Sequence, residues 1–221
     1  MKRNLLIRML LHTAGLLVMT FGIAVTTKGG VGVASVSTIS FAGSKLTPLS
    51  FGMCSSLFHA VCFLSQIAIK RQFTLWSLLQ IPMVYIFGAL LDFFGGLLKF
   101  MAPNIVYGCL VMVAGTFIFS LGLRIILGAD FALTPPDALA KAVGEKMGWP
   151  MSKSKFVFDI ATVSTSAALT FIFLGSPFVA VGVGTIISML LTGPVIGFYY
   201  KIFPFFDLSK DSGAGAETSI P

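Results

Sequence analysis

The sequence contains few charged residues. Asp, Glu, Lys and Arg make up 10% of its 221 residues, whereas about a quarter of a typical soluble domain is charged. Hydrophobic residues make up 56%, with 22 phenylalanines among them, and the mean hydropathy is +0.96. Because so few polar side chains cannot cover the surface of a water-soluble globule, the composition predicts an integral membrane protein.

The sequence also lacks the motifs of soluble enzymes and of metal sites. It has no P-loop, no H-E-x-x-H and no G-x-S-x-G. Cys54, Cys62 and Cys109 lie in apolar segments without ligand spacing. No pair of aspartates and no Ser/His arrangement suggests intramembrane proteolysis. We therefore expect no enzymatic activity, no bound metal and no cofactor.

The basic residues do not form a nucleic-acid-binding surface. The formal net charge is +7, but Lys and Arg occur in short clusters between apolar runs, as the positive-inside rule predicts for membrane proteins. We therefore expect contact with a lipid bilayer and none with nucleic acid.

Six apolar stretches are long enough to cross a bilayer. The first is too long for a signal peptide and lacks an A-x-A cleavage site, so it is expected to remain as a span. The tail 207–221 is polar and rich in Gly and Ser, which predicts a disordered segment. The predicted spans are 5–27, 49–69, 74–98, 104–127, 154–174 and 177–201.

The distribution of basic residues predicts the orientation. A cytoplasmic N-terminus places twelve of the 15 Lys and Arg residues inside and leaves only Lys28, Lys45 and Lys99 outside. This asymmetry predicts cytoplasmic N- and C-termini in a multi-pass protein of the bacterial inner membrane.

Two further segments, 29–47 and 128–148, are neither good spans nor ordinary loops. Both open with small or helix-breaking residues, Gly29-Gly30-Val31-Gly32 in one and Gly128-Ala129-Asp130 with Thr134-Pro135-Pro136-Asp137 in the other. Each continues into about ten moderately apolar residues, a length that suits a re-entrant or interfacial helix.

The chain shows a weak internal repeat. A shift of 100 residues aligns Ala14-Gly15 with Ala114-Gly115 and Gly22 with Gly122, and the two short segments follow the first and the fourth span. We therefore predict an all-α protein of two three-span repeats, 1–103 and 104–206. Because three is odd, the repeats must be inverted relative to each other. Small residues are expected to allow close helix packing at Gly15, Gly22, Gly95-Gly96, Gly108 and Gly115.

Six motifs stand out along the chain. They are the run from Phe21 to Val33, Gly88-Ala89-Leu90-Leu91-Asp92, Pro135-Pro136-Asp137, Lys153 and Lys155 with Asp159, Gly182-Val183-Gly184-Thr185 and Thr192-Gly193-Pro194. Together they resemble the YczE/YyaS/YitT-like family of bacterial six-span membrane proteins over about residues 12–203. The chain departs from the family pattern at Ser37, where Asp is usual, and at Pro136, where Arg is usual. The resemblance implies the six-span fold and the membrane location.

Polar residues at the two short segments are candidates for substrate binding. A short helix that starts inside the membrane presents free N–H groups and a positive dipole end, which suit a polar or anionic solute. The alternative roles are an N-cap or first-turn acid for Asp137 and a snorkelling lysine for Lys28. The candidates are Lys28, Ser35, Ser37, Thr38, Thr134, Pro135 and Asp137.

Three titratable residues in the spans are candidates for proton or ion coupling: His59, Asp92 and Asp159. An ionisable group inside a span is costly and is a functional hypothesis by default. His59 and Asp159 are equivalent under the 100-residue shift. The alternatives are a backbone hydrogen bond for His59, an interfacial position for Asp92, and an i,i+4 ion pair with Lys155 for Asp159.

These features predict a secondary transporter that moves a small polar or anionic organic solute by alternating access, with proton coupling. Such a protein has a small-molecule solute as its partner and is compatible with a homodimer. The alternatives are a membrane-embedded accessory or regulatory protein, and the substrate-binding subunit of a larger transporter.

Overall fold

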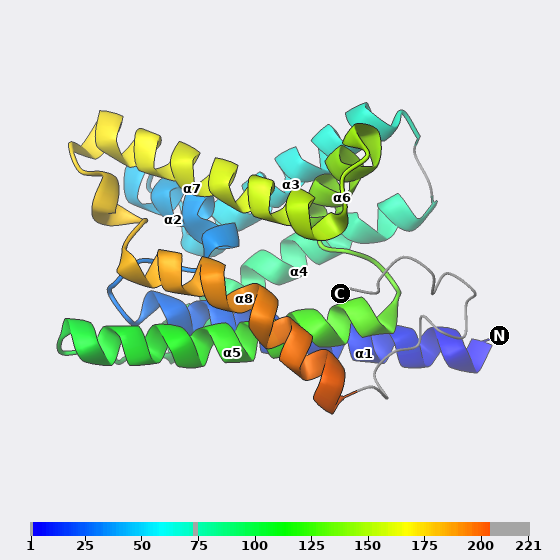
Figure 1. Cartoon of the computed structure of the whole chain (residues 1–221), viewed down its shortest axis with the longest axis horizontal. Coiled ribbons are helices and arrows are strands. Elements are labelled where there is room, and N and C mark those ends of the chain that lie inside the picture. The colour runs from blue at the N-terminus through cyan, green and yellow to red at the C-terminus, as the bar shows by residue number, and fades with distance from the viewer. Residues whose placement is uncertain (1, 73–74, 204–221) are drawn as a thin grey trace.

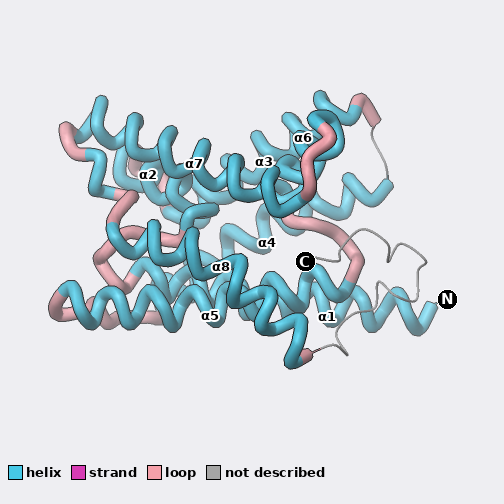
Figure 2. Tube along the Cα trace, viewed as in Figure 1, coloured by secondary structure: helices cyan, strands magenta, loops and turns pink. Residues whose placement is uncertain are grey.

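The computed structural model describes residues 2–72 and 75–203 of the chain. This part is helical, and it contains no strand (Figures 1 and 2). The elements are α1 (Lys2–Thr27), the 3₁₀ turn η1 (Ser35–Ser37), α2 (Thr38–Leu46), α3 (Phe51–Lys70), α4 (Leu75–Leu97), α5 (Ile105–Ala129), α6 (Pro135–Met147), α7 (Met151–Leu174), the 3₁₀ turn η2 (Pro177–Val179) and α8 (Val183–Ile202).

Six of these helices, α1, α3, α4, α5, α7 and α8, are long and apolar enough to cross a membrane. The predicted all-α membrane fold is therefore confirmed. The last span was predicted too long, because 177–179 forms the turn η2 and α8 begins only at Val183. The predicted disordered tail, 207–221, lies outside the described residues.

The two predicted short helices are present as α2 and α6. The sequence determines where α6 begins and ends: Pro135 and Pro136 occupy its first positions, and Gly148 ends it with a left-handed φ of 67°. The chain reaches η1 and α2 through Gly30 and Gly32, which also have positive φ. α2 and α6 lie towards opposite ends of the long axis of the molecule (Figure 1).

Glycines bring α1 and α5 into close antiparallel contact. A Cβ atom added at Gly22 would lie 2.3 Å from the backbone nitrogen of Phe119, so no larger side chain fits there. Close backbone approach is a main source of helix association in membranes. Three glycine pairs meet along the interface: Gly15 with Gly122, Gly22 with Gly115, and Gly29 with Gly108.

The expectation of close packing was wrong for Gly95-Gly96. A Cβ atom added at either residue would meet nothing within 4 Å. These glycines lie near the end of α4, where no other helix approaches that side of the backbone.

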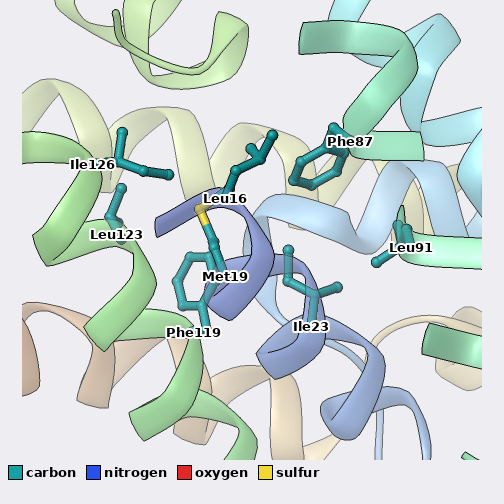
Figure 3. Packing of buried hydrophobic residues seen from close by; sticks show 8 residues of the cluster. All are labelled: Leu16, Met19, Ile23, Phe87, Leu91, Phe119, Leu123 and Ile126. Carbon is teal, nitrogen blue, oxygen red and sulfur yellow. The ribbon is translucent and has the colours of Figure 1, made fainter. Parts of the chain in front are cut away.

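An apolar core joins α4 to the α1–α5 pair (Figure 3). Both helices of the pair and α4 contribute buried side chains, so this group fixes the position of α4 against the pair. The residues drawn are Leu16, Met19, Ile23, Phe87, Leu91, Phe119, Leu123 and Ile126.

The helices α2, α3, α6 and α7 form a second group beside this core, and α8 packs on α5. α2 packs on α3 and α7, and α6 also packs on α3 and α7. The two short helices therefore share both of their long neighbours (Figure 1). Thr38 and Ser40 of α2 and Asp137 of α6 are buried, whereas Lys45 and Lys141 on the same helices are exposed.

Candidate functional site

A partly buried lysine on α7 joins two buried aspartates. The Lys155 Nζ lies 2.9 Å from Oδ1 of Asp137 on α6 and 3.2 Å from Oδ1 of Asp159, one turn further along α7. Asp137 and Asp159 are each 6% exposed, and the Lys155 side chain is 20% exposed. The predicted i,i+4 pair of Lys155 and Asp159 is therefore present, and a third charged group belongs to it.

The start of α6 places Asp137 in this arrangement. Asp137 is the acid of the first helical turn, and its Oδ2 accepts a hydrogen bond of 2.6 Å from the Thr134 hydroxyl. Burial alone would raise the pKa of Asp137, but the Lys155 ammonium and the hydrogen bonds from Thr134 and Lys155 hold that pKa below its ordinary value. Asp137 is therefore ionised while Lys155 remains beside it.

His59 on α3 borders the same ion pair. Its ring is 4% exposed and packs against Phe87 at 4.3 Å between centroids. The imidazole is close enough to Asp137 and Lys155 to interact with both charges. His59 Nδ1 is buried without a hydrogen-bond partner. We refer to Asp137, Lys155, Asp159 and His59 together as the ionic cluster.

The first half of the chain reaches the cluster through η1 and α2. The Ser35 side chain hydrogen-bonds to Asp159, and the Ser166 hydroxyl of α7 donates to the Thr38 carbonyl at 3.0 Å. Ser35, Ser37 and Thr38 are all buried. The starts of both short helices thus meet at α7, one through Ser35 and the other through Asp137.

The structure places the other two candidates elsewhere. The Lys28 ammonium donates to the Gly95 carbonyl at 2.9 Å. Asp92 accepts hydrogen bonds from the Ser50 hydroxyl at 2.5 Å and from the Gly52 amide at 2.7 Å, which caps the start of α3. The contacts of both residues therefore lie outside the ionic cluster. Pro135 is buried beside Thr134 at the start of α6.

The sequence did not predict the contacts of two basic residues, Lys155 and Arg124. Lys155 was expected only as the partner of Asp159, although it is the group that joins the two carboxylates. Arg124 was counted as a cytoplasmic residue, but it is fully buried in α5, lies 3.9 Å from the centroid of the Tyr200 ring, and donates to the Phe203 carbonyl at 3.1 Å. The burial of Arg124 could have been predicted from the apolar residues on both sides of it in Leu121–Ile126.

The side chains of the cluster determine what the site can do chemically. Among residues 2–72 and 75–203, no three His, Cys, Asp or Glu side chains converge so as to hold a metal ion. The cluster offers two buried carboxylates, one buried imidazole and one partly exposed ammonium. These are groups that can exchange protons or bind a small charged solute.

The fold and the site define a polytopic α-helical membrane protein with charged groups buried between its helices. The chain belongs to the family described as "Family of unknown function (DUF6198)", whose model matches residues 6–201. It is similar to the "Uncharacterized membrane protein YczE" of Bacillus subtilis (strain 168), with 24% identity over 205 residues that cover 90% of this chain and 87% of the relative. The expected resemblance to YczE-like proteins is confirmed. No solved structure matches the chain.

Proposed function

We propose that this protein is a secondary transporter that moves a small polar organic solute by alternating access, coupled to protons, with the ionic cluster as its binding and coupling site. The observation that carries the proposal is the buried Asp137–Lys155–Asp159 arrangement. Ion pairs of this kind rarely improve stability over apolar packing. Charged groups inside membrane proteins usually mark proton or substrate pathways, and they are seldom there for stability.

The packing of the helices supports the inverted repeat on which alternating access would depend. The pair α3–α6 has its counterpart in α7–α2, and α1–α4 has its counterpart in α5–α8. The glycine contacts show the same correspondence between the two halves. The 100-residue shift converts the pair Gly15–Gly122 into Gly115–Gly22, which is also a contact. His59 and Asp159 are related by the same shift, so each half contributes a titratable group at an equivalent position.

The proposal includes a definite orientation in the bacterial inner membrane, with both termini cytoplasmic. Lys45 at the end of α2 and Lys141 on α6 are both exposed side chains and would face opposite sides of the membrane. In a cysteine-free background, we expect a membrane-impermeant maleimide to label Lys45→Cys from outside intact cells and Lys141→Cys only after permeabilisation. Labelling of both from the same side would contradict the inverted arrangement.

Transport itself is testable in proteoliposomes. We expect a proton gradient to drive uptake of a small polar solute from a panel of radiolabelled amines, amino acids, carboxylates and polyols. Asp159→Asn and His59→Ala are expected to reduce the uptake rate to that of protein-free liposomes, because each removes a titratable group of the cluster. Glu145→Gln is the matched control, since Glu145 pairs on the surface with Lys70 and Lys141.

Two results would refute the transport proposal. One is gradient-independent flux that Asp159→Asn leaves unchanged. The other is an absence of flux for every solute, together with co-purification of a stable partner protein. The second result would support the accessory or subunit function instead.

A further inference from the structure

The ionic cluster contains one more negative than positive charge. Asp137 and Asp159 supply two carboxylates, and Lys155 supplies one ammonium. Within the described ranges, no other ammonium or guanidinium forms an ion pair with either carboxylate. An uncompensated charge at a site only 6% exposed is strongly unfavourable. One additional positive charge is therefore required for the buried site to be neutral.

Two groups of the cluster are open to receive that charge. His59 Nδ1 is buried without a hydrogen-bond partner, and the buried Asp159 Oδ1 lies 3.2 Å from the Lys155 ammonium. A proton on either group makes the cluster neutral, and both groups feel the same two charges, Asp137 and Lys155. An organic ammonium ion beside Asp159 would neutralise the cluster equally well.

An anion would be poorly bound at the same place. Pro135 and Pro136 occupy the first positions of α6, and proline has no N–H, so this helix start lacks two of the donors that usually bind anions. The Asp137 carboxylate lies at the third position and repels negative charge. The nearest buried cation, Lys155, is already shared by two carboxylates.

We infer that the solute is an organic ammonium ion, and that it exchanges one for one with a proton held by the ionic cluster on His59 or Asp159. This inference rests on the proposed transport function and names its substrate class. In one state the proton neutralises the cluster, and in the other the ammonium ion does so after the proton has left to water. The empty, deprotonated site is disfavoured because it keeps a net negative charge, so the exchange is obligatory.

The titratable groups around the proton come from α3, α6 and α7. Asp159 interacts with Lys155 on its own helix and with Asp137 on α6, and His59 and Cys62 on α3 interact with the same Asp137 and Lys155. From η1, Ser35 adds a hydrogen bond without a charge. Removal of either Asp159 or His59 should therefore change both the number of protons released and the pH at which they are released.

The test uses the purified full chain in detergent and a weakly buffered solution with a pH indicator. We expect saturating choline, tetramethylammonium or ethanolammonium chloride to release about one proton per chain. Sodium lactate and glycerol should release none. Asp159→Asn should abolish the release, Asp159→Glu should retain it at a shifted pH, and Glu145→Gln should leave it unchanged.

The outcomes separate this inference from the transport proposal. Proton release by an ammonium ion without flux in proteoliposomes would support the ammonium site and refute transport. Proton-driven flux of lactate, with no release by any of the three ammonium ions, would leave transport standing and overturn the substrate class. Undiminished release from Asp159→Asn, folded as judged by its circular dichroism, would also overturn the inference.

Discussion

Replacement of Lys155 by methionine should destabilise the folded protein by about 3 kcal/mol, which is at the lower end of the range for breaking a buried ion pair because Lys155 is 20% exposed. The variant leaves the Asp137 and Asp159 carboxylates buried close together without their shared counter-charge. Methionine is unbranched and only one heavy atom shorter than lysine, so the loss reports on charge more than on packing. Thermal unfolding in detergent micelles, followed by circular dichroism, measures it.

A second lysine provides the matched control. Lys70 forms an ion pair with Glu145 at 3.1 Å, but the two side chains are 40% and 51% exposed. Exposed pairs of this kind contribute at most about 1 kcal/mol, so Lys70→Met should unfold close to the wild-type temperature. Adding Asp137→Asn to Lys155→Met should recover part of the lost stability, because one uncompensated carboxylate is removed. Equal losses in the Lys155 and Lys70 variants would show that the cluster is not a buried charge network.

Most of the fold could be predicted from the lengths of the apolar runs and from the positions of helix-breaking residues. Six apolar runs gave six long helices, and Pro135 and Pro136 marked the start of α6. The boundary of α8 was missed because 177–182 is as apolar as a span, and hydropathy does not distinguish a 3₁₀ turn and loop from a helix. The failure at Gly95-Gly96 has a similar cause, since composition does not reveal which side of α4 faces a neighbour.

The candidate site was only partly predictable. The 100-residue shift identified His59 and Asp159, and the structure places both beside Asp137. The bridging role of Lys155 needs α6 and α7 to meet, which no local pattern reports. Lys28 suggested an anion site from sequence proximity alone, whereas its ammonium is bound to the Gly95 carbonyl of α4.

A second large loss of stability is expected from a substitution at the glycine contact between α1 and α5. Gly22→Ala should destabilise the protein by about 2–3 kcal/mol, as overpacking of a tight interface does. The added methyl group would lie 2.3 Å from the Phe119 nitrogen and 2.9 Å from the Gly115 carbonyl oxygen. Both are backbone atoms and have no other rotamer, so the two helices must move apart. The unfolding temperature in detergent measures the loss.

Gly95→Ala is the matched control for this prediction, because it makes the same chemical change in a membrane helix where a Cβ atom meets nothing within 4 Å. It should leave stability unchanged or raise it by up to about 1 kcal/mol, since alanine favours a helix more than glycine does. In the proposed inverted repeat α1 and α5 are the equivalent first spans, so their separation would also disturb both halves at once. We therefore expect Gly22→Ala to lower uptake in proteoliposomes although Gly22 has no contact with the ionic cluster. Equal stability of the two alanine variants would mean that the glycine pairs do not determine how closely the halves pack.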